Sequence, residues 1–235
     1  MSKIFDDFVI SPIEDLTLWD NLVKSSLQST IFHHSAFLNS FNTNVKKFLI
    51  SKNKLIKAGF VIITDQDNTN IVNNDLIVHN GIFFIENKNQ NEISRKIERI
   101  DIVDCLLTYL KKNFNSINIT LSPKIDDLRP FVWFKNKFFK MEINIRHTLY
   151  LNIAELKNSL EFKHTFLYKA MQRSRRRQIN EYENNNCSYV VTEDYKPLID
   201  FYKKNFISQG LNLSNKKIEQ IEKIIQNLLI SKKGF

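Results

Sequence analysis

The chain contains FLISKNKLIKAGFVIIT at residues 48–64. Two apolar runs, 48–50 and 58–64, flank a short polar connection, and aromatic or β-branched residues dominate both runs. This pattern is typical of two β-strands that are joined as an antiparallel hairpin. Because the connection is short, we expect the sheet that contains these strands to be largely antiparallel.

Helical patterns lie on both sides of this hairpin. Apolar residues recur at helical spacing from Leu16 to Val23, and they follow one face of a long helix from Glu92 to Lys112. A buried strand is expected at 117–121 and a further strand at 142–153. Since strands and helices alternate in this way, the sequence predicts an α/β (α+β) fold, with a mixed sheet flanked by helices.

Composition narrows the class of protein. The chain has 34 Lys and Arg residues against 25 Asp and Glu residues, a net charge of +9, which favours anionic partners such as nucleic acid, phosphorylated metabolites or an acidic membrane surface. The nearest two of its four glycines, Gly59 and Gly81, are 81 − 59 = 22 positions apart. This spacing excludes a dinucleotide fingerprint, a phosphate loop and a nucleophile elbow.

The number of cysteines and the lengths of the apolar runs indicate the cellular compartment of the protein. Two cysteines, Cys105 and Cys187, cannot form a disulfide framework or a four-cysteine zinc site. The longest purely apolar stretch, 58–63, is far shorter than the roughly 20 residues that a membrane span requires. We therefore expect a cytoplasmic protein without a metal or a transmembrane segment, which could associate peripherally with the inner face of the membrane.

A long basic helix is predicted from Leu156 to Tyr182. At about 100° per residue, four of its basic side chains fall within one sector, whereas Arg175 projects towards the opposite side. We call these four residues the basic stripe. It consists of Lys169, Arg173, Arg176 and Arg177. A further helix is expected at 215–230.

Three interpretations of the basic stripe stay open. It is a solvated helix face, or a phosphate-binding face for a nucleotide-linked sugar, a lipid-linked intermediate or a tRNA backbone. The third interpretation is sequence-independent nucleic-acid binding, for which aromatic platforms are needed beside the arginines. Tyr168 and Tyr182 are the nearby candidates for such platforms.

Three local motifs carry a resemblance to a known family. They are IFHHSAFL at 31–38, DLRPFVW at 127–133 followed by HTLYL at 147–151, and SRRRQIN at 174–180. In this order, the motifs resemble those of the Fem (FemABX) peptidyltransferases and of the wider GNAT-fold acyltransferases. The resemblance covers roughly residues 30–235.

The resemblance implies two GNAT-like halves, here 1–148 and 149–235. The second half begins with a strand and the long basic helix but lacks the further strands of the family, so it is incomplete. The resemblance also implies an acyl- or aminoacyltransferase that acylates an amine of a cell-envelope polysaccharide or peptidoglycan precursor. Acyl-CoA or aminoacyl-tRNA would be the donor. Such a chain is truncated or split, or it is completed by self-association or by a complementing C-terminal chain.

Arg129 joins the basic stripe as a candidate contact for an anionic small-molecule or lipid-linked precursor. It either lines a pocket with Trp133 or braces the helix that follows. No residue stands out as a catalytic base. The competing hypothesis is a non-catalytic basic binding module for RNA, including tRNA, or for another phosphate-bearing ligand.

Overall fold

A computed structural model describes residues 7–41, 44–87, 89–133, 142–149, 151–157, 162–188, 192–211 and 213–232. The chain divides into two compact units. The first unit comprises residues 1–142 and 195–235, and the second comprises residues 143–194. The predicted boundary between two halves at 148/149 stays a prediction, since compact units need not coincide with related halves.

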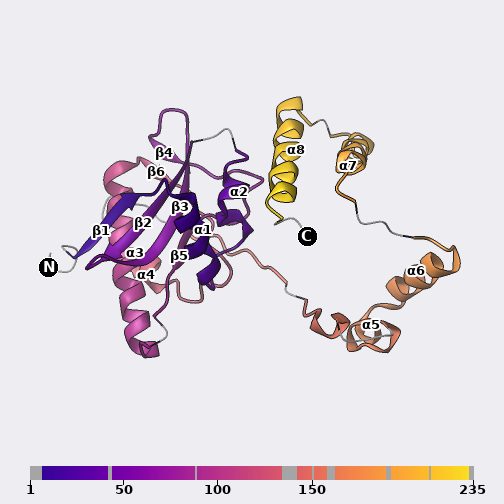
Figure 1. Cartoon of the computed structure of the whole chain (residues 1–235), viewed down its shortest axis with the longest axis horizontal. Helices are drawn as coiled ribbons and strands as arrows, with labels where there is room; N and C mark the ends of the chain where they lie inside the picture. Colours follow the sequence, from indigo (N-terminus) through magenta and orange to yellow (C-terminus); the bar gives the residue numbers. More distant parts are fainter. Residues whose placement is uncertain are drawn as a thin grey trace. The chain divides into compact units, whose positions relative to one another are not determined.

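Within the described residues, the first unit holds a six-stranded mixed sheet (Figure 1). Its strands are β1 (Phe8–Pro12), β2 (Asn44–Lys52), β3 (Leu55–Thr64), β4 (Asn70–Ile71), β5 (Gly81–Phe84) and β6 (Ser116–Ile117). β1, β2 and β3 are antiparallel neighbours, and β3 also pairs antiparallel with both β4 and β5. β4 and β6 form a parallel pair. The predicted mixed, flanked sheet is thereby confirmed.

The predicted hairpin is the centre of this sheet. In it, β2 and β3 pair from Asn44 opposite Thr64 to Lys52 opposite Leu55. The two connecting residues, Asn53 and Lys54, have φ values of 51° and 65°. Two consecutive left-handed residues match the right-handed twist of the flanking strands, which favours a tight two-residue turn.

Helices flank the sheet in the first unit. They are α1 (Leu16–Ser25), α2 (Ser35–Leu38), α3 (Glu92–Asn113), α4 (Arg129–Trp133) and α8 (Asn215–Ile230), with a 3₁₀ turn at Ile31–His33. Among the described residues, a further helix of this unit, α7 (Lys196–Ser208), contributes no residue to the apolar clusters of the sheet. α3 begins after Asn91, whose side-chain oxygen accepts a hydrogen bond from the Ser94 N–H. The predicted helices at 92–112 and 215–230 are confirmed. No helix among the described residues is both long and apolar enough to cross a membrane.

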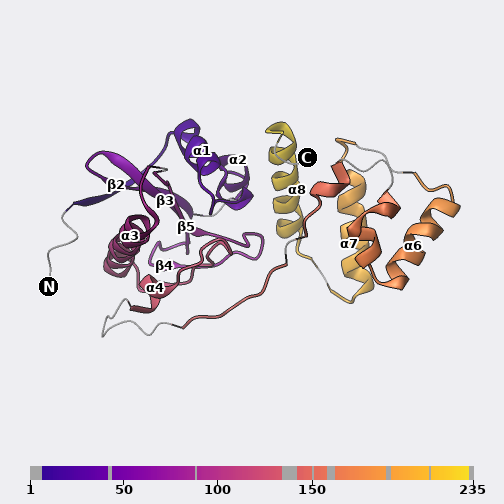
Figure 2. The same cartoon turned by 90° about the horizontal axis from the view of Figure 1, so that it is seen from below.

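The sheet separates two apolar clusters, because alternate residues of a strand point to opposite faces. On one face, Phe48 and Phe60 are stacked with ring centroids 4.9 Å apart, and the apolar side of α3 packs against them. On the other face, Val61 and Phe83 pack with Trp19 of α1. Figure 2 shows α3 and α4 on one side of the sheet and α1 and α2 on the other.

One glycine is required by this packing. A Cβ atom at Gly59 in β3 would lie 2.5 Å from a ring carbon of Phe83, a distance at which atoms clash. Phe83 in turn contacts Trp19 edge to face, with centroids 5.2 Å apart. The absence of a side chain at position 59 therefore lets the Phe83 ring of the neighbouring strand β5 lie against β3.

The prediction of one continuous basic helix at 156–182 is wrong. The second unit instead holds 3₁₀ turns at Ala154–Lys157 and Phe162–His164, then α5 (Phe166–Ala170) and α6 (Arg173–Asn184). The backbone is extended at Met171 and Gln172, so the helical path is interrupted between α5 and α6. Neither helix buries a side chain, and short helices depend on packing of an apolar face for most of their stability.

The prediction of a strand at 142–153 is also wrong. Residues 142–149 and 151–153 belong to no β-ladder in the structure, because no neighbouring strand pairs with them among the described residues. The apolar side chains of Ile145 and Leu149 are 76% and 97% exposed. Positions 187, 188 and 192 are not in a strand either.

Candidate substrate-binding pocket

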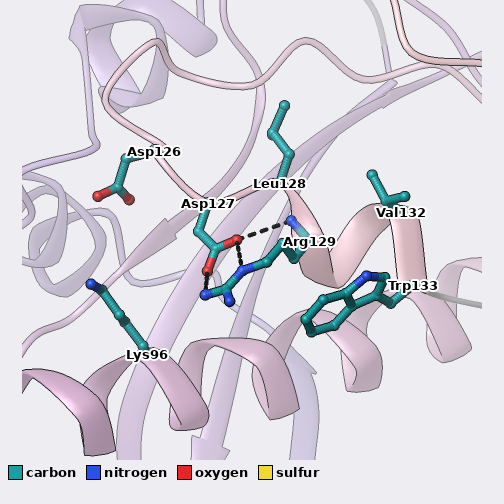
Figure 3. Close-up of a pocket in the computed structure, with 7 residues that line it drawn as sticks. All are labelled: Lys96, Asp126, Asp127, Leu128, Arg129, Val132 and Trp133. Carbon is teal, nitrogen blue, oxygen red and sulfur yellow. Dashed lines mark hydrogen bonds and ion pairs between the residues drawn. The ribbon is translucent and has the colours of Figure 1, made fainter.

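An open hollow of about 460 Å³ lies beside the start of α4. Lys96 of α3 borders it together with residues on and just before α4 (Figure 3). These residues are Asp126, Asp127, Leu128, Arg129, Val132 and Trp133. Arg129, which the sequence singled out, therefore lies in a concave site next to Trp133.

Asp127 holds Arg129 in place. The Nε and Nη2 atoms of Arg129 donate hydrogen bonds to the two carboxylate oxygens of Asp127, at 2.9 and 2.6 Å. The backbone N–H of Arg129 donates a third bond to the same carboxylate, at 3.0 Å. Side-chain hydrogen bonding from Arg129 is the main cause that lowers the pKa of Asp127 to about 2. The guanidinium is thus fixed by a bidentate, charge-assisted contact.

Trp133 supplies an exposed aromatic surface. The guanidinium carbon of Arg129 lies over the indole ring, 5.3 Å from its centroid, within the range of a cation–π interaction. Trp133 is nevertheless 55% exposed. Its partner on the helix holds the ring in position while leaving much of it open to solvent.

The remaining charges of the hollow are also paired. The ammonium of Lys96 contacts Glu92 at 2.6 Å, one turn earlier in α3. Asp126 contacts Arg99 at 3.6 Å, and its side chain is 74% exposed. Two cations and two carboxylates therefore line the hollow, and their charges balance.

The basic stripe lies in the second unit, on two helices. Lys169 is on α5, whereas Arg173, Arg176 and Arg177 are on α6. Arg177 contacts Glu181 at 3.3 Å across one helical turn. Within the described residues, the structure thus brings three of the predicted residues together on one helix and places Arg129 at the α4 hollow.

The charges of α6 run against its macrodipole. Four arginines occupy its first five residues, and no acidic residue lies in its first turn. Glu181 and Glu183 lie instead in its second half. Cations are favoured at the C-terminal end of a helix and anions at the N-terminal end, so helix stability does not explain this order. Arg173, Arg175 and Arg177 are exposed, and Arg176 is half-buried.

A second polar cluster joins α1 to α2. The Asp20 carboxylate accepts hydrogen bonds from the Ser35 N–H at 2.9 Å and from the Ser35 hydroxyl at 2.7 Å, and His34 contacts it at 3.4 Å. His33 beside them is completely buried, which lowers its pKa to about 4. Among the described residues, no group of three His, Cys, Asp or Glu side chains could hold a metal ion. The contacts of this cluster fit a structural role.

Sequence reasoning assigned no role to Asp127 or Lys96, which line the hollow with Arg129. Asp127 could have been found, because an Asp side chain that accepts the backbone N–H two residues further on is a recurrent turn pattern before a helix. Lys96 carried no such signal, since it reaches the hollow only through the packing of α3 against α4.

Comparisons with protein families, with curated proteins and with solved structures find no match for this chain.

Proposed function

We propose that this chain is a GNAT/FemABX-like acyl- or aminoacyltransferase-related protein. It would acylate an amine of a cell-envelope polysaccharide or peptidoglycan precursor. The observation that supports this most is the order of elements in the first unit. Antiparallel strands β1, β2, β3 and β5, with α1 and α2 after the first of them, are followed by the long helix α3 and then by β6, which pairs in parallel with β4. The three sequence motifs occur in the same chain and add to this support.

The chemistry asks the protein mainly to position two substrates. The lone pair of the acceptor amine attacks the carbonyl carbon of a thioester or ester, and a C–N bond forms. The C–S or C–O bond to the donor then breaks, and the amine proton is lost to solvent or base while the thiolate or alkoxide takes up a proton. Orientation and stabilisation of the oxyanion can supply much of the rate without a fixed triad.

The basic stripe would hold the precursor in this scheme. Arg173, Arg176 and Arg177 carry guanidinium forks that suit the phosphates of an anionic or lipid-linked molecule, and Lys169 adds a point charge. The chain would work in the cytoplasm or at the inner face of the membrane. Its second GNAT-like half, from residue 149, would be completed by self-association or by a complementing C-terminal chain.

The proposal is tested by transfer of a labelled acyl group. The purified chain is incubated with labelled acyl-CoA or aminoacyl-tRNA and with a membrane fraction that contains envelope precursors, and the products are identified by mass spectrometry. We expect an acylated amine in one of the two donor arms. Replacement of Arg173, Arg176 and Arg177 by Ala should reduce precursor binding, while Arg175→Ala, on the opposite side of α6, serves as the matched control. Absence of an acylated product with both donors, with and without a C-terminal fragment of a related transferase, would refute the proposal.

The charge order of α6 favours one alternative, a non-catalytic basic module that binds RNA. Exposed arginines that oppose the helix dipole are consistent with a phosphate backbone as ligand, and Tyr182, 44% exposed, could stack on a base. In that case RNA binding should weaken steeply with salt, with a slope of about −0.7 per neutralised phosphate. Acylation should then be absent in both donor arms.

A further inference from the structure

In the hollow beside α4, the aromatic ring of Trp133 is exposed to solvent, although tryptophan side chains are on average highly buried. The chain has two tryptophans, of which Trp19 is fully buried and Trp133 is 55% exposed. We propose that the hollow is a nucleobase site, in which an adenine ring stacks on Trp133 and donates its amino group to Asp126. The choice of adenine rests on the proposed function, because acyl-CoA and the 3′ end of aminoacyl-tRNA both carry an adenosine.

The platform is held in place before any ligand arrives. Arg129 is fixed by two side-chain hydrogen bonds to Asp127, and it lies over the Trp133 ring at 5.3 Å (Figure 3). A guanidinium over an indole restrains the rotation of the ring, so little conformational freedom is left to lose on binding. Stacking on an exposed aromatic side chain is available to every base, because every base has a π-face.

The charges favour a neutral ring over a phosphate. Arg129 directs three hydrogen bonds to Asp127, and Lys96 contacts Glu92. A phosphate entering the hollow would compete with the Asp127 carboxylate for the guanidinium, and it would meet the negative charges of Asp126 and Asp127. A planar base requires no such exchange, because it adds no charge.

Asp126 gives the hollow a preference among bases. Its carboxylate is 74% exposed and is held only at 3.6 Å by Arg99, so it can accept a hydrogen bond from an amino group at the ring edge. Adenine offers such an amino group, whereas hypoxanthine has a carbonyl oxygen in its place and uracil has no amino group. A carboxylate facing a carbonyl oxygen is repelled, so the site should discriminate against both.

Apolar side chains complete the site. Leu128 is 37% exposed and Val132 is 56% exposed, and both line the hollow beside Trp133. The hollow has a volume of about 460 Å³ and is open to solvent. The ribose can lie against these two side chains, with the phosphates outside the hollow.

The site is tested by fluorescence of the intact chain. In a Trp19→Phe variant, the emission comes from Trp133 alone, and stacking of adenine should quench it saturably. Adenosine and AMP should bind with similar affinity, and inosine and uridine should bind roughly tenfold more weakly, the loss expected for one hydrogen bond to a charged group. Coenzyme A and the trinucleotide CCA are the two further arms, and the tighter of the two identifies the source of the adenosine.

Variants separate the two contacts. Trp133→Ala should abolish binding of labelled adenosine in equilibrium dialysis, and Trp133→Phe should retain part of it. Asp126→Ala should remove the preference of adenosine over inosine, while Lys124→Ala, close in sequence but outside the hollow, should change neither. Melting temperatures of all variants establish that each is folded.

Two results would overturn the inference. One is the lack of saturable quenching by adenosine at millimolar concentration, and the other is unchanged adenosine binding by folded Trp133→Ala. The proposed function is judged separately by acyl transfer. Transfer without adenosine binding would refute the nucleobase site alone, whereas adenosine binding without transfer would refute the proposed function alone.

Discussion

Asp127 serves two purposes at the residue scale. It accepts the backbone N–H of Arg129, where α4 begins, and it binds the Arg129 side chain. Asp127→Ala removes both contacts, and loss of the hydrogen bond from the Arg129 N–H costs about 1 kcal/mol of unfolding free energy. The exposed ion pair should add little to this figure. Asp127→Asn retains an acceptor for the Arg129 N–H, so it should unfold at a denaturant concentration closer to that of the wild type.

The pH dependence of the Asp127 contribution has a defined direction. Its pKa is lowered to about 2 in the folded chain, below the ordinary value of 3.8. The stabilisation is therefore present above about pH 3.8 and is lost as the pH falls through about 2. Equal acid sensitivity of the wild type and of Asp127→Ala in this range would contradict the assignment.

His33 should govern stability in a milder acid range. Its ring is completely buried and packs edge to face on Phe83, with centroids 5.3 Å apart. Burial lowers its pKa to about 4 from the ordinary 6.5, so the unfolded chain binds the proton more readily than the folded chain does. Stability should be fully present above about pH 6.5 and should fall by up to about 1.4 kcal/mol per pH unit as the pH decreases towards 4.

Urea unfolding across this pH range measures the His33 effect. Replacement of His33 by Gln removes the titrating ring, and its stability should depend less on pH even if it is lower throughout. Asp20, whose pKa is lowered, titrates below its ordinary 3.8. Burial also lowers the pKa of His79, which acts on His33, so His79→Gln is measured in parallel to separate the two rings. A His33→Gln curve that is parallel to the wild-type curve would show that another group is responsible.

At the scale of elements, the sequence patterns correctly predicted those helices and strands whose apolar side chains are buried in the structure. The 92–112 pattern became α3 because Ile102, Leu106 and Leu110 are buried against the sheet. The 48–64 pattern became β2 and β3 because both faces of the hairpin are covered. The pattern at 156–182 did not give one continuous helix, because no apolar face of α5 or α6 is buried against another element.

The residues of the candidate site also divide into those that a local sequence pattern could predict and those that it could not. Arg129 was found from its local motif, and Asp127 was accessible from spacing alone. Lys96 and Asp126 join the hollow through the packing of α3 against α4 and through long-range charge, which no local pattern contains. The exposure of Trp133 was likewise beyond a sequence argument, because aromatic clusters at short spacing are ordinarily buried in a core.

The N-terminal turn of α6 should be stabilised by a change of charge. Arg173→Glu places an anion at the positive end of the helix macrodipole, which is worth a few tenths of a kcal/mol at an exposed site. Amides of α6 should then exchange with solvent deuterium more slowly, while binding of a phosphate-bearing precursor should weaken. Lys169→Glu, in the separate helix α5, is the control and should leave exchange in α6 unchanged. Faster exchange in Arg173→Glu would contradict the dipole argument.

At the scale of the whole molecule, we expect copies of the chain to associate through residues 142–149 and 151–153. Apolar side chains alternate with polar ones along them, and Leu151 and Ile153 are 66% and 55% exposed in addition to Ile145 and Leu149. An unpaired extended segment with one apolar face readily adds to another strand. We expect concentration-dependent association in sedimentation velocity, and binding of a hydrophobic dye.

Substitutions on the two faces of this segment test whether its apolar face causes the association. Leu149→Lys should reduce association, whereas Asn144→Lys, which adds the same charge on the polar face, should have a smaller effect. A wild-type chain that stays monomeric at all concentrations and does not bind the dye would contradict the expectation.

One photolabelling measurement on the intact chain tests both the proposed function and the nucleobase site. An acyl-CoA that carries an azido-adenine is irradiated with the protein, and the modified peptides are mapped by mass spectrometry. We predict labelling of the peptide that contains Trp133, suppression by excess adenosine but not by uridine, and loss of the label in Trp133→Ala. Labelling of the Arg173–Arg177 peptide instead, or equal suppression by uridine, would contradict a donor site at the α4 hollow.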